Sequence, residues 1–176
     1  GKLTSNYMAE GNDLSVDKIE NYVRSSCEAV LGGDNIVHEP MDVVVYGFGR
    51  IGRLVTRLLV EKTGGGQNLV HKAVVLRPPK DPIKDLNKRA SLLRKDSIHG
   101  SFKGTIRIDE KNRALICNGN VIYFIYSNDP SSIDYTKYGI KNALVIDSSG
   151  VWRDEEGLSQ HLKSKGVAKV LLTTSG

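Results

Sequence analysis

The chain has 176 residues, of which 39% are hydrophobic, so it is long enough for one packed domain with a small appendage and is not a disordered protein. Charged residues of both signs are interspersed, no apolar run approaches the roughly 20 residues that cross a bilayer, and no basic-then-apolar leader is seen, so we expect neither a membrane span nor a secretory leader. The net charge of +5 suits an anionic ligand, a phosphate-bearing cofactor or nonspecific nucleic acid contact, although scattered surface lysines give the same total.

Residues 1–40 predict an N-terminal helical extension with a linker. A polar lead-in is followed by Ser15, a candidate helix cap, and by apolar residues at helical spacing: Ile19, Val23, Cys27 and Val30. Gly32 and Gly33 then end the helix, and residues 33–40 resemble a linker. We therefore divide the chain into an extension over 1–40 and a domain over 41–176.

The first half of that domain alternates strands and helices. Residues 43–46 (VVVY) form the continuous apolar run that a buried parallel strand needs. A helix follows, with an apolar face made by Ile51, Leu54, Val55, Leu58 and Leu59 and an end at Gly64–Gly66. Residues 69–76 (LVHKAVVL) predict a second strand, and three prolines then precede a short helix near Leu86–Arg94.

The second half inserts a hairpin before the alternation resumes. Residues 104–109 (GTIRID) and 114–127 (ALICNGNVIYFIYS) predict antiparallel strands, with turns at Lys111-Asn112 and Asn118-Gly119. A strand at 142–147, a helix near Glu155–Ser164 and a strand at 168–174 follow. Together these elements predict an α/β fold, a Rossmann-like, doubly wound, mostly parallel sheet with an antiparallel hairpin insertion.

A glycine motif lies between the first predicted strand and helix. It reads G-x-G-x-x-G and consists of Gly47, Phe48, Gly49, Arg50, Ile51 and Gly52. In this setting the first glycine permits the turn, the second lets backbone amides approach a pyrophosphate, and the third lets the helix pack closely on the strand. The helix start adds N–H groups and a partial positive charge, and Arg50 either contacts phosphate there or is solvated. The motif predicts a dinucleotide site.

The end of the second predicted strand lacks the acidic residue that would accept hydrogen bonds from the adenosine ribose and repel a 2′-phosphate. The sequence there reads Leu76-Arg77-Pro78, and the first carboxylate is Asp81. Arg77 is therefore either a partner for a 2′-phosphate or an exposed loop residue. We expect NAD or NADP as the cofactor, with NADP at least tolerated.

The two cysteines, Cys27 and Cys117, are far apart, with no C-x-x-C pair and no histidine at ligand spacing. We expect neither a disulfide framework nor a metal site, and a reducing cytoplasm fits this usage best. Cys27 lies on the apolar stripe of the N-terminal helix and Cys117 in a hairpin strand, so we interpret both as structural residues rather than nucleophiles.

Five segments carry a resemblance to a known family: YGFGRIGRLVTR (46–57), DLNKRASLLRKDSIHGSFKGTI (85–106), ICNGNVIYFIYSNDPSSIDYTKYGI (116–140), LVIDSSGVW (144–152) and AKVLLTTSG (168–176). From Val43 to Gly176 the chain resembles the N-terminal, cofactor-binding part of phosphorylating glyceraldehyde-3-phosphate dehydrogenase. The helical segment before Asp42 is similar to the extension of the longer bacterial form.

The resemblance implies roles for individual residues. Arg50 and Ile51 match residues whose backbone faces the pyrophosphate, and Arg77 and Pro78 stand in place of the family's Asn-Asp pair. The remaining matches are Asn128 beside the adenine, Ser149 and Gly150 along the cofactor groove, and Thr173 near the nicotinamide half. Each of these small residues also suits a tight turn. His99, in DSIHG, matches a residue with local hydrogen bonds rather than a catalytic one.

The resemblance also implies chemistry that this chain does not carry. In the family a cysteine thiolate of an S-C-T-T-N motif attacks the aldehyde, a histidine accepts a proton, and hydride passes to the nicotinamide. The sequence contains no such motif, so we expect no catalytic residue here and interpret the chain as a fragment that binds cofactor without catalysing.

The resemblance implies that the parent is a cytoplasmic homo-oligomer acting on glyceraldehyde 3-phosphate. The alternatives are erythrose-4-phosphate dehydrogenase and, less favoured, a non-catalytic module that senses nucleotides or binds nucleic acid through Arg50, Arg53 and Arg57.

Overall fold

The computed structural model describes residues 40–62, 68–96 and 100–173. The chain divides into two compact units, 1–38 and 39–176, and every described residue belongs to the second. The predicted N-terminal helix with Cys27, the helix end at Gly64–Gly66 and the local role of His99 lie outside the described residues.

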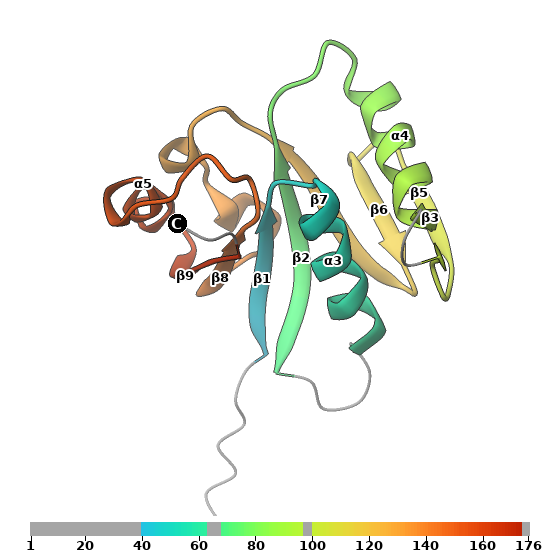
Figure 1. Cartoon of the computed structure of the whole chain (residues 1–176), viewed down its shortest axis with the longest axis horizontal. Coiled ribbons are helices and arrows are strands. Elements are labelled where there is room, and N and C mark those ends of the chain that lie inside the picture. The colour runs from blue at the N-terminus through green and yellow to red at the C-terminus, as the bar shows by residue number, and fades with distance from the viewer. Residues whose placement is uncertain (1–39, 63–67, 97–99, 174–176) are drawn as a thin grey trace, which may run out of the picture. The chain divides into compact units, whose positions relative to one another are not determined.

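Seven strands of the described residues form one sheet in the order β5-β6-β7-β2-β1-β8-β9. They are β1 (Met41–Tyr46), β2 (Leu69–Leu76), β5 (Ile106–Asp109), β6 (Ala114–Cys117), β7 (Asn120–Tyr126), β8 (Ala143–Asp147) and β9 (Val167–Leu172). Strands β7, β2, β1, β8 and β9 pair in parallel, whereas β5, β6 and β7 pair antiparallel (Figure 1). The predicted mostly parallel sheet with a hairpin insertion is thus confirmed. A separate short pair, β3 (Lys95–Asp96) and β4 (Gly100–Ser101), was not expected.

Three α-helices lie within the described ranges: α3 (Arg50–Lys62), α4 (Pro82–Arg94) and α5 (Glu155–Leu162). Helix α3 packs on β1 and β2, α4 lies beside the hairpin strands, and α5 lies beside β9 at the other end of the sheet (Figure 1). None of these helices has the length and apolar character that a membrane span requires. Two 3-10 turns, Pro130–Ser132 and Tyr135–Tyr138, lie between β7 and β8.

Helix α4 begins four residues before the predicted start, and the cause is local. The Asp81 carboxylate accepts the backbone N–H groups of Ile83 and Lys84, at 3.1 and 3.0 Å, and so caps the helix. Pro82 occupies the first turn, where its missing N–H costs nothing. The last of the three prolines, which suggest a break between elements, is therefore the first residue of the helix.

The central strands are covered on both faces. Val45 belongs to a buried cluster with Val74 and the α4 residue Leu86, whereas its neighbour Val44 belongs to a second cluster with Tyr135. This alternation explains why β1 is apolar at consecutive positions, since both of its faces are buried.

The order in which the chain adds strands to the sheet reverses beside β1. Strands β2 and β7 extend the sheet on one side of β1, and β8 and β9 extend it on the other. Tyr46 and Asp147, the last residues of β1 and β8, are direct neighbours. Ligands of open α/β sheets bind at such a point, outside the carboxyl ends of the strands.

Candidate functional site

A cavity of about 400 Å³ opens at this point of the sheet. It is lined by residues at or after the ends of four parallel strands, together with one residue of α4 and two of the segment before α5: Tyr46, Gly47, Phe48, Gly49, Val75, Leu76, Arg77, Arg89, Asn128, Ser148, Ser149, Val151 and Trp152. The fold therefore brings together segments that are as much as about 100 residues apart.

The three motif glycines are needed for different reasons. Gly47 has φ +93°, and a Cβ there would lie 2.9 Å from the backbone of Ser149. A Cβ on Gly52 would lie 2.2 Å from the carbonyl oxygen of Gly47, so helix and loop touch. A Cβ on Gly49, in contrast, would meet no described atom within 4 Å. Packing within the chain thus requires Gly47 and Gly52, whereas Gly49 leaves open space through which a phosphate can approach the backbone.

The start of α3 adds an electrostatic attraction for anions. The N–H of Arg53 donates to the carbonyl of Gly49 at 3.1 Å, so the N–H groups of Arg50, Ile51 and Gly52 precede the helical bonding pattern. These groups and the helix dipole make a place for negative charge. The side chains of Arg50 and Ile51 are exposed and do not line the cavity, so contacts from these two residues would come from the backbone.

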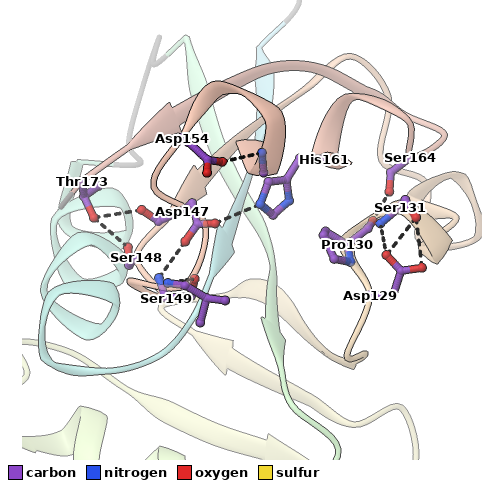
Figure 2. Close-up of polar contacts among 12 residues, drawn as sticks. Asp129, Pro130, Ser131, Asp147, Ser148, Ser149, Asp154, His161, Ser164 and Thr173 are labelled. Atoms are coloured by element: carbon purple, nitrogen blue, oxygen red, sulfur yellow. Dashed lines mark hydrogen bonds and ion pairs between the residues drawn. The ribbon is translucent and has the colours of Figure 1, made fainter. Parts of the chain in front are cut away.

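The wall formed by Ser148 and Ser149 is held by a buried polar network (Figure 2). Asp147 and His161 are both 0% exposed, and Asp147 Oδ2 lies 2.9 Å from His161 Nε2. The other carboxylate oxygen accepts the N–H of Ser149 at 2.7 Å. Thr173 donates its N–H and its hydroxyl to the Asp147 carbonyl, each at 3.0 Å. Asp147 thereby joins β8, β9 and α5 to the cavity wall.

Tyr46 connects the glycine loop to the same network. Its ring packs edge-on against His161, with 4.6 Å between the ring centroids. Burial first, and the nearby charge of Asp147 second, raise the pKa of the Tyr46 phenol to about 12. The phenol is therefore neutral at physiological pH and acts here as a packing group.

Six of the twelve predicted binding residues line the cavity: Gly47, Phe48, Gly49, Arg77, Asn128 and Ser149. The other six are not among its lining residues: Arg50, Ile51, Gly52, Pro78, Gly150 and Thr173. The other seven lining residues, among them Arg89 and Trp152, were not predicted from the sequence. No local motif marks Arg89, because α4 brings it to the cavity through packing of Leu86 and its neighbours.

The three arginines on α3 differ in their exposure. Arg57 is 6% exposed and donates to the carbonyls of Leu93 and Gly100, at 2.6 and 3.0 Å. Arg53 is partly buried and donates to the Phe48 carbonyl at 3.5 Å. The suggestion that Arg50, Arg53 and Arg57 form one basic face is therefore wrong, because the third is used inside the protein.

Cys117, the cysteine that falls within the described residues, is fully buried in β6. Burial raises the pKa of its thiol to about 11, so the thiolate is scarce at physiological pH. The prediction that Cys117 is a strand residue is confirmed.

Comparison with known proteins agrees with this geometry. The family profile described as glyceraldehyde 3-phosphate dehydrogenase, NAD binding domain, matches residues 41–155. The chain is 56% identical to a glyceraldehyde-3-phosphate dehydrogenase-like protein of Pseudomonas aeruginosa (strain UCBPP-PA14), over 100% of this chain and 37% of that protein.

Two fungal proteins match a shorter part of the chain. Those named glyceraldehyde-3-phosphate dehydrogenase from Ajellomyces capsulatus and Monascus purpureus are 37% and 36% identical, over 74% of this chain and 35% of each. The chain thus spans little more than a third of the length of the curated relatives described here. With the parallel sheet, the glycine loop and the cavity at the reversal point, these matches show that the chain belongs to the glyceraldehyde-3-phosphate dehydrogenase family and contains its NAD-binding domain.

Proposed function

We propose that the cavity binds NAD or NADP and that the longer protein uses this cofactor for the phosphorylating oxidation of glyceraldehyde 3-phosphate. The observation that carries the proposal is the open space over Gly49, in a loop whose other two glycines are fixed by contacts of the chain itself. Family membership supports a nicotinamide dinucleotide, whose nicotinamide ring accepts a hydride when bound.

Within the cavity we assign the pyrophosphate to the glycine loop and to the first N–H groups of α3, from Arg50 and Ile51. Arg77 and Pro78 then lie at the adenosine ribose, and Asn128 at the adenine. Ser149, Gly150 and Thr173 extend toward the nicotinamide half. The assignment is supported by the cavity lining, which joins the glycine loop, Arg77, Asn128 and Ser149 in one space.

We further propose that this chain contributes cofactor binding and no catalytic residue to the enzyme. The buried Cys117, with its raised pKa, is unsuited to attack an aldehyde. We infer from the family a cytoplasmic, homo-oligomeric parent. Assaying the longer protein with glyceraldehyde 3-phosphate and with erythrose 4-phosphate would decide which aldehyde it prefers.

Calorimetric titration of the chain with NAD and with NADP tests the proposal directly. We expect saturable binding of at least one dinucleotide, with circular dichroism showing that the sample is folded. A folded chain that binds neither would contradict the assignment of the cavity.

Arg77→Ala tests the ribose end of the cavity. We expect this change to weaken NADP more than NAD, because a guanidinium forms charge-assisted hydrogen bonds to a 2′-phosphate that NAD lacks. Lys80→Ala is the matched control, since Lys80 is an exposed cation of the same segment that does not line the cavity. An equal effect of Arg77→Ala on both dinucleotides would remove the argument.

A further inference from the structure

The charged residues that line the cavity are all cationic. Among the described residues that line it, two carry a guanidinium, Arg77 and Arg89, and none carries a carboxylate. The two arginines come from different parts of the fold: Arg77 directly follows β2, and Arg89 lies on the second turn of α4. Two cations that converge on one space without a counter-charge in its lining favour an anionic ligand group there.

The carboxylate nearest in sequence to the β2 end is occupied elsewhere. Asp81 accepts the N–H groups of Ile83 and Lys84 and lies 3.6 Å from the Lys84 ammonium group. It caps α4 and does not line the cavity. The cavity therefore lacks the acidic group that would accept hydrogen bonds from ribose hydroxyls and repel a phosphate on them.

Arg89 is held in a fixed orientation. Its Nε donates to the two carboxylate oxygens of Asp85, at 3.2 and 3.4 Å, and the Tyr126 hydroxyl donates to the same carboxylate at 3.4 Å. One Nη group lies 3.5 Å from the carbonyl of Phe48 in the glycine loop. The side chain is 26% exposed, and Arg89, oriented by Asp85 through Nε, is one of the residues that line the cavity. Asp85 partly offsets the positive charge of Arg89, but it does not line the cavity.

We propose that Arg89, together with Arg77, forms a subsite for the 2′-phosphate of NADP, so that the domain prefers NADP to NAD. The proposal rests on the proposed function, because it places the phosphate on a dinucleotide bound by the glycine loop. A planar guanidinium fixed through Nε presents its remaining N–H groups as a fork, which matches the oxygens of a phosphate monoester.

The unmodified chain gives the first test by calorimetry with NADP and NAD, followed by competition with 2′-AMP and 5′-AMP. Because hydrogen bonds to charged groups are the stronger ones, we expect NADP to bind about tenfold or more tightly than NAD, and 2′-AMP to compete better than 5′-AMP. Equal affinities for NAD and NADP would overturn the subsite and leave the proposed function standing. A folded chain that binds neither dinucleotide would overturn the proposed function itself.

Arg89→Met and Lys88→Met give the second test. They remove the same charge from adjacent positions of α4, but Lys88 is exposed and does not line the cavity. We expect Arg89→Met to weaken NADP much more than NAD, and so to abolish most of the preference for NADP, and Lys88→Met to keep the preference.

Two results would contradict the subsite. An equal loss of NADP preference in Arg89→Met and Lys88→Met would mean that the preference depends only on the overall charge of the protein. Equal weakening of NAD and NADP by Arg89→Met would mean that Arg89 merely supports the glycine loop through Phe48. If Arg89→Met does not fold, the competition between 2′-AMP and 5′-AMP on the unmodified chain decides.

Discussion

Two segments leave neighbouring parallel strands at the same edge of the sheet and line the same cavity, yet they are built differently. The glycine loop after β1 is confined, because side chains at Gly47 or Gly52 would collide with backbone atoms. The segment 77–81 after β2 is largely exposed, and its fixed point is the cap formed by Asp81. The difference indicates that the confined loop provides binding common to dinucleotides, whereas the exposed segment is free to set the choice between them.

The largest loss of stability is expected from breaking the buried Asp147–His161 pair, which holds the cavity wall beside the glycine loop. His161→Leu leaves Oδ2 of the buried Asp147 side chain without its hydrogen-bond partner, and an unsatisfied buried polar group of this kind costs about 3 kcal/mol. Urea denaturation would measure this loss in the free energy of unfolding. Gln160→Leu, on the same turn of α5 but partly exposed, is the control, and equal losses in both variants would contradict the role of the pair.

Gly52→Ala and Gly49→Ala separate packing from binding within the glycine loop. Gly52→Ala places a Cβ 2.2 Å from the Gly47 carbonyl oxygen, and overpacking of this kind costs about 1–3 kcal/mol. Gly49→Ala meets no described atom, so its unfolding free energy should change by less than about 0.5 kcal/mol. We nevertheless expect Gly49→Ala to weaken both dinucleotides in calorimetry. If a folded Gly49→Ala chain bound both dinucleotides with unchanged affinity, the glycine loop would not be part of the binding site.

Asp81→Ala, on the exposed side, should change stability modestly and dinucleotide binding least of all. Loss of the cap on α4 is expected to cost about 1 kcal/mol in thermal or urea unfolding. Dinucleotide affinity should stay the same, because Asp81 does not line the cavity. The Asp81→Asn variant keeps a capping oxygen and should retain most of the stability. If Asp81→Ala instead lost NAD binding at unchanged stability, Asp81 would be a ribose ligand and the contrast between the two segments would fail.

Local patterns were enough for much of the fold. The bounds predicted for β2, residues 69–76, agree with the structure, because a run of branched apolar residues between loop signals defines a buried strand. Asn118 and Gly119 join β6 and β7 as predicted, and both have positive φ. The glycine motif likewise predicted the strand, turn and helix around it, because the tight turn and the close helix packing depend on residues next to one another in the sequence.

Tertiary structure decided which charged and polar side chains reach the cavity. Arg57 and Arg89 look alike in sequence, since each is an arginine on a helix of the same half of the domain, yet one donates to buried carbonyls and the other lines the cavity. Asp147 and His161 are 14 residues apart and become partners only when α5 packs beside β9. The sequence by itself determined the strands, the turns and the dinucleotide loop, because neighbouring residues carry those signals. The surroundings of a side chain depend on how helices dock, and docking is set by contacts between residues far apart in the chain.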